Sequence, residues 1–386
     1  MKKKLEFRNI FLRFKGLFSI GFSDVISGGI SSFFWLYLAT LLDVESYGKI
    51  FYLLAIVSVA STISLIGSRN TLSVYIPKNI QLQSAVYFIV VIFGTVSTLI
   101  IFSLYRDLGL SLYVIGAVIF GSSTSEILAK KLYMVYSKYL ITQKIISVGL
   151  SLGLYHWIGV DGVILGIALS FFVYVPIIIK TFKTSKINFS LLRPRFGFLL
   201  NSYAIDIIST LGKQADKLVI VPLLGLTLLG NYQLGIQFIS VFQLLPMIVL
   251  KYTLPHDASG NTNKNLKITT ILISICFTVL IIILAPIIIT FFFQKFIYVI
   301  EVIQILSLSL IPLTINTIYT SKFFASENSK IILINVTLYL SSFLLSVLII
   351  GNMWGIAGIA IAYVISSIVP IIYLIVMDLR NKISKF

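Results

Sequence analysis

Residues 16–41 read GLFSIGFSDVISGGISSFFWLYLATL, and Asp24 is the single charged residue among them. A helix crosses the hydrocarbon core of a bilayer with about 20 predominantly apolar residues, so this stretch is long enough to span a membrane. The rest of the chain has the same character: of its 386 residues, 58% are hydrophobic and 11% are charged. Because a soluble domain carries about 25% charged residues, the sequence predicts an all-α polytopic membrane protein.

Apolar windows of this length recur along the whole chain. With connecting loops of roughly 8–12 residues, the chain has room for about 12 spans. The windows lie at residues 16–41, 48–67, 81–104, 109–129, 139–157, 161–181, 196–223, 230–250, 266–293, 297–321, 331–350 and 355–377. We therefore expect about 12 transmembrane helices.

The cations lie mainly in the gaps between these windows. The chain carries 30 Lys and Arg against 13 Asp and Glu, a formal net charge of +17. If the N-terminus is cytoplasmic, 24 of the 30 cations fall in inner segments, while the outer gaps hold only Lys49, Arg106 and Lys295. The positive-inside rule then predicts a multi-pass protein of the cytoplasmic membrane with both termini in the cytoplasm. Topology thus explains the charge, and we expect no nucleic-acid partner.

The first and seventh windows share a short motif. Residues 24–27 read Asp-Val-Ile-Ser and residues 206–209 read Asp-Ile-Ile-Ser, an offset of 182. The same offset carries Gly48, which opens the second window, onto Gly230, which opens the eighth. This repeat indicates two related halves that enter the membrane in the same direction, because six windows precede the second copy.

A second pair of motifs marks the ends of the two halves. Residues 159–163 read Gly-Val-Asp-Gly-Val and residues 355–359 read Gly-Ile-Ala-Gly-Ile, an offset of 196. The two offsets differ because loops of different length intervene. We expect two pseudo-symmetric six-helix lobes, residues 1–187 and 188–386, with the substrate site between the halves, as in other transporters built from parallel repeats.

The seventh window carries the densest group of charges. Lys213 and Lys217 are four residues apart and share a helix face, and Asp216 is three residues from Lys213. Either the group neutralises itself, or its surplus positive charge faces a cavity and binds an anionic group such as a phosphate. Lys144, in the fifth window, is a further candidate substrate contact, with extension to the cytoplasmic surface as the alternative.

Three acidic residues, Asp24, Asp206 and Glu126, are candidates for ion coupling or for a cavity wall, because charges inside a membrane are costly. Asp24 lies beside serines that recur every four residues, which form either a hydrated wall or a close helix contact. These serines are Ser19, Ser23, Ser27 and Ser31. Asp206 is the counterpart of Asp24, and the alternative for both is a bond to a neighbouring helix. The alternative for Glu126 is a pair with Lys130, one turn later.

The sequence lacks the motifs of nucleotide-dependent and hydrolytic chemistry. It contains no GxxxxGK[ST] loop and no HExxH or GxSxG motif. Cys276 is the only cysteine, and His156 and His256 lie far apart, so no zinc-ligand pattern exists. We expect Cys276 to be a small core residue. We predict a protein that is not an enzyme and uses no metal and no cofactor.

Two segments resemble a known family. Residues 34–48 read FWLYLATLLDVESYG and look like the first hairpin of the Wzx-type oligosaccharide flippases. These polysaccharide biosynthesis membrane proteins belong to the MOP superfamily, which also contains the MATE drug exporters. Residues 216–225 read DKLVIVPLLG and precede Gly230-Asn231-Tyr232, which resembles the D-[KR]-x(5)-LLG…G-x-Y pattern of the same family.

The resemblance implies the MATE-like MOP fold, with two lobes around a hydrated, cationic cavity. It implies alternating access that moves a polyprenyl (pyro)phosphate-linked oligosaccharide from the inner to the outer leaflet, for surface polysaccharide or glycan assembly. Lys217 matches the basic position that follows the acid in the family pattern, whereas Lys213 is added from helix spacing alone.

Two other functions remain open. One is a MATE-type small-molecule exporter coupled to H⁺ or Na⁺ through Asp24 or Asp206. The other is a non-transporting scaffold in a glycan-assembly complex. For the flippase, the predicted partners are the lipid-linked oligosaccharide, membrane lipids, a coupling ion (H⁺ or Na⁺) and glycan-assembly enzymes.

Overall fold

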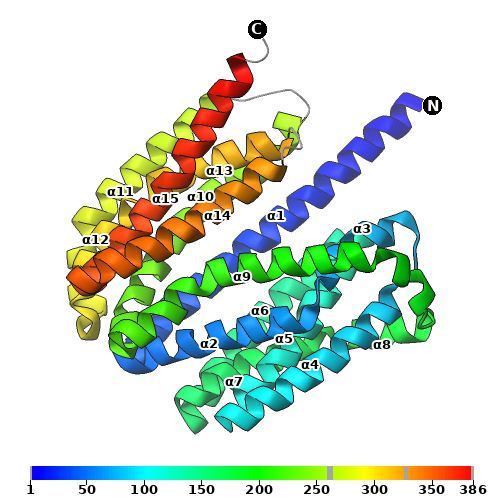
Figure 1. Ribbon diagram of the computed structural model, residues 1–386, viewed down its shortest axis with the longest axis horizontal. Helices are drawn as coiled ribbons and strands as arrows, with labels where there is room; N and C mark the ends of the chain where they lie inside the picture. The colour runs from blue at the N-terminus through cyan, green and yellow to red at the C-terminus, as the bar shows by residue number, and fades with distance from the viewer. Residues whose placement is uncertain (1, 259–263, 326–328, 384–386) are drawn as a thin grey trace. The chain divides into compact units, whose positions relative to one another are not determined.

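The computed structural model describes residues 2–258, 264–325 and 329–383, and the regular structure of these residues is helical (Figure 1). Side chains are described for residues 20–244, 246–247, 264–323, 330–351 and 353–380, so the side chain of Ser19, in the predicted serine stripe, lies outside the described part. In chain order the α-helices are α1 (Lys2–Leu41), α2 (Val44–Leu65), α3 (Ser68–Tyr75), α4 (Gln83–Tyr105), α5 (Leu108–Ala129), α6 (Tyr133–Ile158), α7 (Val160–Ser170), α8 (Val175–Thr184), α9 (Phe196–Leu224), α10 (Leu226–Ala258), α11 (Lys264–Phe292), α12 (Val299–Ser307), α13 (Leu310–Ala325), α14 (Ser329–Ser346) and α15 (Asn352–Ile383).

Each of the predicted windows coincides with one of these helices or with two consecutive ones. In the part of the chain that the structure describes, nine helical segments are long and apolar enough to cross a membrane. The three remaining windows are filled by α6, α9 and α10, which are long but more polar. The predicted all-α polytopic fold with about 12 spans is therefore confirmed.

Short polar residues at the connections explain where several helices begin. The backbone N–H of Ser46 donates a hydrogen bond to Asp43 Oδ2 at 3.0 Å, at the start of α2. The Leu110 N–H donates to Asp107 Oδ1 at 2.9 Å, at the start of α5. Each carboxylate satisfies an amide that has no partner inside its helix. Hydrogen bonding to Ser46 also lowers the pKa of Asp43 below its ordinary value.

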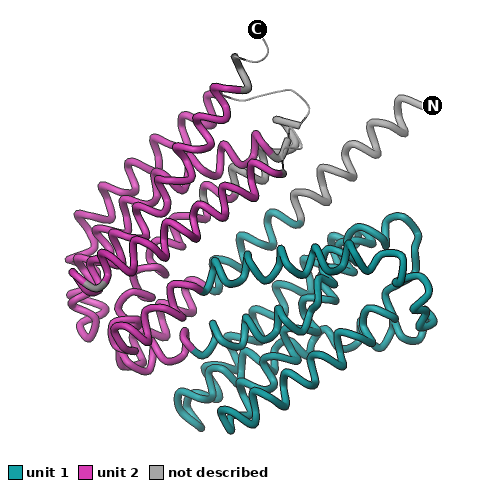
Figure 2. Tube along the Cα trace, in the orientation of Figure 1, with its two compact units in different colours: residues 1–31, 53–214 teal, residues 32–52, 215–386 magenta. Residues whose placement is uncertain are grey.

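The described chain forms two compact units, which Figure 2 colours separately. Unit 1 comprises residues 1–31 and 53–214, and unit 2 comprises residues 32–52 and 215–386. The ends of α1 and α9 and the start of α2 belong to unit 2, while the remainder of these helices belongs to unit 1. The lobes 1–187 and 188–386 describe the halves of the chain and stay a prediction.

In unit 2, the glycines related by the offset of 182 contact one another's helices. A Cβ atom on Gly48 of α2 would lie 2.1 Å from the Leu226 carbonyl oxygen, and a Cβ atom on Gly230 of α10 would lie 2.0 Å from the Val44 carbonyl oxygen. Val44 and Leu226 are themselves related by 182 residues. The contact is therefore reciprocal, as across a two-fold axis, and it supports the predicted internal repeat.

The second pair of motifs forms two equivalent helix–helix corners. Gly159 joins α6 to α7 with a φ of 71°, and Gly355 in α15 has a φ of 56°; both values favour glycine. Each corner contains a second glycine three residues later. A Cβ atom on Gly162 would lie 2.4 Å from the Leu154 carbonyl oxygen, and a Cβ atom on Gly358 would lie 2.3 Å from the Ile350 carbonyl oxygen. The offset of 196 thus relates both the turn and the close helix contact that follows it.

The prediction that Cys276 is a core residue is wrong, because its side chain is exposed on α11. Neighbouring apolar side chains of the same helix are exposed too, including Leu272, Val279 and Ile283. In a membrane span an apolar side chain is stable against lipid, so apolar character does not place Cys276 in the core.

Candidate functional site

Helix α9 carries four of the predicted site residues at successive depths. At 1.5 Å per residue, Asp206 lies about 15 Å from the first residue of α9, Lys213 about 26 Å, and Asp216 and Lys217 about 30 Å and 32 Å. The first two residues belong to unit 1 and the last two to unit 2. Each pair therefore has surroundings within its own unit.

In unit 1, Asp206 is held by helix α3. The Asn70 side chain donates a hydrogen bond from Nδ2 to Asp206 Oδ1 at 3.2 Å. The positive charges of Arg69 and Lys213 both act on the Asp206 carboxylate. Helix α3 lies this close to α9 because Gly67 has no side chain: a Cβ atom there would lie 2.4 Å from the Leu199 carbonyl oxygen. Asp206 thus interacts with two cations and an amide.

Arg69 is a candidate site residue that sequence reasoning missed, because its position after a span is typical of an inner-loop cation. Its half-buried side chain lies against α5, where Gly121 leaves room for the guanidinium group. Burial lowers the pKa of Arg69, and the negative charge of Asp206 opposes that shift. Within the described residues, Arg69 Nε and Asp206 Oδ2 are buried without a hydrogen-bond partner. Both groups therefore retain hydrogen-bonding capacity.

In unit 2, Asp216 and Lys217 form an ion pair. Lys217 Nζ lies 3.0 Å from Asp216 Oδ1, and both side chains are largely buried. The Asp216 charge acts on three tyrosines, the buried Tyr232 of α10 and the half-buried Tyr339 of α14 and Tyr363 of α15. The predicted lysine–aspartate contact is therefore present between adjacent residues, and the charge of Asp216 acts on tyrosines that the sequence did not indicate.

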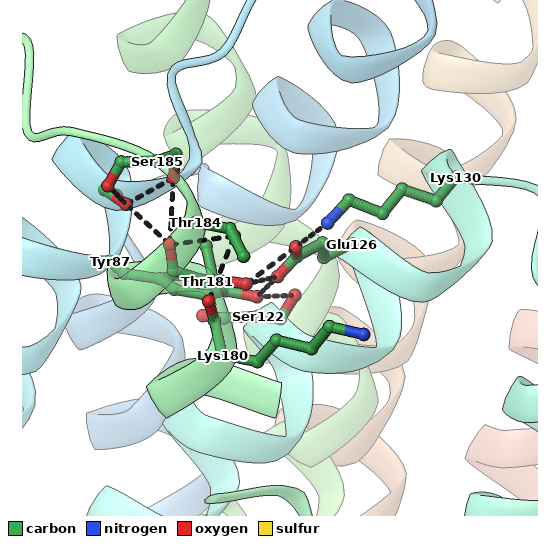
Figure 3. Close-up of polar contacts among 9 residues, drawn as sticks. Tyr87, Ser122, Glu126, Lys130, Lys180, Thr181, Thr184 and Ser185 are labelled. Carbon is green, nitrogen blue, oxygen red and sulfur yellow. Dashed lines mark hydrogen bonds and ion pairs between the residues drawn. The ribbon is translucent and has the colours of Figure 1, made fainter. Parts of the chain in front are cut away.

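Glu126 joins three helices of unit 1 (Figure 3). The residue is 1% exposed. The Thr181 hydroxyl of α8 lies 2.8 Å and 2.9 Å from its two carboxylate oxygens, and Tyr87 of α4 donates a further hydrogen bond. Lys130, one helical turn away, forms an ion pair with it. The alternative contact, the pair with Lys130, is present, and Glu126 connects α4, α5 and α8.

Asp24 and Lys144 occupy different places in unit 1. The Tyr136 hydroxyl of α6 donates a hydrogen bond to Asp24 Oδ1 at 3.0 Å, so the carboxylate joins α1 to α6. Ser23 and Ser27 beside it are buried. Lys144 is half-buried on α6, two turns beyond Tyr136. The structure thus shows a helix contact for Asp24, and it places Lys144 on a different helix from the charges of α9.

Tyrosine is the residue type that sequence reasoning left out of the site. Tyr136 contacts Asp24, Tyr87 contacts Glu126, and the charge of Asp216 acts on three tyrosines. A tyrosine inside an apolar span needs a partner for its hydroxyl, and an interior carboxylate needs donors. The occurrence of both residue types in the spans is the signal that could have indicated these contacts.

No cluster of three or more metal-ligating side chains occurs among the described residues. The described carboxylates interact with hydroxyl groups, amides and cations of the chain. Such a set can bind and orient a polar or ionic group by hydrogen bonds and charge.

Comparison with solved structures identifies the fold. The lipid II flippase MurJ, in an inward closed conformation, matches with a TM-score of 0.62 and 18% identity, over 97% of this chain and 87% of that chain. A multidrug resistance MATE family transporter of the MOP superfamily, in an inward-facing conformation, matches with a TM-score of 0.62 and 13% identity, over 96% of this chain and 98% of that chain.

A MOP superfamily transporter from Pyrococcus furiosus, whose binding pocket is described as having reverse polarity, matches with a TM-score of 0.62 and 14% identity over 96% of each chain. No protein-family model and no curated protein matches the chain. The likeness to these structures extends over nearly the whole chain. The chain therefore has the fold of the MOP superfamily transporters.

Proposed function

We propose that this chain is a flippase that moves a polyprenyl (pyro)phosphate-linked oligosaccharide across the cytoplasmic membrane by alternating access. The observation that carries the proposal is the set of charges on α9 and its packing partner α3. Three cations, Arg69, Lys213 and Lys217, accompany two acids, Asp206 and Asp216. This surplus of positive charge suits an anionic headgroup, and the sequence resemblance to oligosaccharide flippases and the MurJ-like fold support the same substrate class.

The spacing of these cations suits a headgroup that moves through the membrane. Lys213 and Lys217 are one turn apart on α9, in the second half of the helix by residue count. Charge-assisted hydrogen bonds from lysine and arginine bind phosphate oxygens strongly. In this proposal, a phosphate that leaves Lys213 can bind Lys217 within one helical turn. The phosphate therefore keeps a cationic partner while the headgroup crosses the membrane.

A MATE-type exporter is the second candidate. The MATE neighbours favour it, as does Asp24, whose bond to Tyr136 a proton would weaken. In either case the proposed location is the cytoplasmic membrane, with both termini in the cytoplasm. The partners proposed for the flippase are membrane lipids, a coupling ion and glycan-assembly enzymes.

The experiment measures flipping by the full chain in vesicles that hold a fluorescent polyprenyl pyrophosphate-linked oligosaccharide. A membrane-impermeant quencher reports how much of the probe reaches the outer leaflet. We expect the double variant Lys213→Ala/Lys217→Ala to flip at least tenfold more slowly, because each charge-assisted bond contributes about 1.5–3 kcal/mol. The Lys213→Arg/Lys217→Arg variant should retain flipping.

The matched control is Lys49→Ala/Lys138→Ala, which removes two exposed lysines and should leave the rate within twofold. Unchanged flipping in the Lys213/Lys217 double variant would contradict the assignment of these lysines. Efflux of a cationic dye by vesicles that do not flip the lipid probe would favour the exporter.

A further inference from the structure

The segment between α8 and α9 is unusually basic. We define the basic connector as residues 180–198, which cover the end of α8, two short 3₁₀ helices and the start of α9. Between Asp161 and Asp206 the sequence contains no acidic residue. The cations of the connector are Lys180, Lys183, Lys186, Arg193 and Arg195. This segment therefore has a local positive charge that no acid within it offsets.

Large apolar side chains alternate with these cations and are exposed. Phe189 is 47% exposed and Phe196 is 52% exposed. Phe182, Ile187 and Phe198 are also exposed. Aromatic side chains are enriched at the interface between the bilayer and water, and a segment with both basic and exposed apolar side chains is typical of a membrane-surface element.

The connector is folded rather than extended. The Asn188 side chain accepts a hydrogen bond from the Ser190 N–H at 3.0 Å and so starts the first 3₁₀ helix. The Ser84 hydroxyl of α4 donates to the Ser185 carbonyl oxygen at 2.8 Å. Leu192 is buried in a core cluster with Leu82 and Leu199. The basic side chains thus project from a packed backbone, which lowers the entropy lost when they bind a ligand.

The connector lies where membrane-spanning segments of unit 1 begin or end. Helix α4 begins at Gln83, α8 ends at Thr184, and α9 begins at Phe196. Figure 1 shows α3, the end of α8 and the start of α9 at the same end of this unit. The Arg195 guanidinium lies 5.1 Å from the Tyr75 ring centroid, and Lys78 Nζ lies 5.6 Å from the same centroid. Lys78, in the 3₁₀ turn Ile76–Lys78 that follows α3, therefore extends the positive surface of the connector.

We propose that the basic connector is a binding site for the anionic phospholipid headgroups of the leaflet that it borders, the one that the charge distribution predicts to be cytoplasmic. The positive-inside rule requires cations in an inner loop but requires neither a folded backbone nor exposed aromatic residues. The connector has both. Its phenylalanines enter the interface while its lysines and arginines contact lipid phosphates. This site is independent of the proposed transport function.

An anionic lipid fits better than a soluble acidic partner. Exposed phenylalanines at the end of membrane spans meet the acyl boundary, where they are stable, whereas a soluble polyanion would leave them in water. Each Lys or Arg near an anionic membrane surface strengthens binding by about fivefold, from about 1 kcal/mol. Several cations on one packed segment therefore favour anionic over zwitterionic lipid by orders of magnitude.

The experiment uses the purified full chain in detergent and counts retained lipids by native mass spectrometry. The probes are phosphatidylglycerol and phosphatidylcholine, added at equal concentration. We expect the unmodified chain to retain phosphatidylglycerol preferentially and the triple variant Lys183→Gln/Lys186→Gln/Arg193→Gln to bind it at least tenfold more weakly. The charge-conserving variant Lys183→Arg/Lys186→Arg/Arg193→Lys should bind as the unmodified chain does, which shows that the fold of the connector is retained.

The matched control is Lys131→Gln/Lys138→Gln/Lys330→Gln, which removes three exposed lysines from other predicted inner segments and should bind within twofold of the unmodified chain. A second variant, Phe189→Ser/Phe196→Ser, leaves the charge unchanged and should weaken retention at least threefold. Equal losses in the triple variant and its control would overturn the proposal, as would full retention in both connector variants or displacement of the lipid by soluble polyglutamate.

Discussion

A Gly230→Ala variant is expected to lose about 3 kcal/mol of stability, the upper end of the range for an overpacked site. The new Cβ atom would lie 2.0 Å from the carbonyl oxygen of Val44 and 2.9 Å from its carbonyl carbon. These are backbone atoms, so no side-chain rotation relieves the overlap, and α2 must move away from α10. We expect a fall of several degrees in the midpoint of thermal unfolding of the purified protein, and less folded protein in the membrane fraction.

The reciprocal position should behave in the same way. Gly48→Ala places a Cβ atom 2.1 Å from the Leu226 carbonyl oxygen, across the same contact. Because either substitution separates the same two helices, the double variant should lose less than the sum of the two single losses. Additive losses would show that the two glycines belong to separate contacts.

The control for Gly230→Ala is a glycine-to-alanine variant that should raise stability instead of lowering it. Gly153 of α6 is exposed, and a Cβ atom there would meet nothing within 4 Å. Gly153→Ala should therefore raise stability by about 0.5–1 kcal/mol, since alanine restricts the unfolded chain more than glycine does. If Gly230→Ala and Gly153→Ala shift the unfolding midpoint alike, the close contact at Gly230 is not present in the folded protein.

The spans and the repeat could be predicted because they depend on properties local in sequence. Apolar character sustained over 20 residues indicates a span whatever it packs against, and the offset of 182 needs only two similar segments. The structure adds a physical reason for the matching glycines of the two copies: Gly48 and Gly230 are the points at which equivalent helices touch. Sequence alone indicated that these positions are equivalent, and gave no reason to expect that they contact one another.

Contacts between distant segments account for what sequence reasoning missed. Arg69 follows a span and has the charge expected of an inner loop, yet α3 folds back so that this charge acts on Asp206, far along the chain. The hydroxyl of Tyr136 likewise reaches Asp24 only because α1 and α6 pack together. Hydropathy is averaged over a window, so it carries no information about which of two polar residues faces another helix. The pairing of Glu126 with Lys130 could be predicted because both lie on one helix, one turn apart.

Replacing Arg69 with methionine is expected to cost about 3 kcal/mol. The Asp206 carboxylate would keep its bond to Asn70 but lose its electrostatic interaction with Arg69. Removing one partner of a buried charge pair costs about 3–5 kcal/mol because the other charge stays buried. We expect a cost at the lower end of this range because the Arg69 and Asp206 side chains are only half-buried. The measurement is the free energy of unfolding of the purified protein. The control is Arg193→Met, which removes an equal charge from an exposed position and should change this free energy by less than about 0.5 kcal/mol.

A double-mutant cycle separates this interaction from simple loss of packing. Asp206→Asn alone removes the negative charge beside Arg69 and should also destabilise, while the double variant Arg69→Met/Asp206→Asn leaves neither charge of the pair uncompensated. We expect the double variant to be less destabilised than the sum of the single variants by at least about 1 kcal/mol. Additive losses would mean that Arg69 and Asp206 act independently.

The double variant also decides what the Arg69–Asp206 interaction does in transport. If the two charges only stabilise α3 against α9, a chain that lacks both and is folded should flip the lipid-linked probe at the rate of the unmodified chain. If Arg69 contacts the phosphate, as the proposed function requires of this cation cluster, flipping falls at least tenfold in a protein that is stable. Because the loss then occurs without unfolding, it is assigned to substrate binding, and Arg69 joins Lys213 and Lys217 among the residues that bind the headgroup.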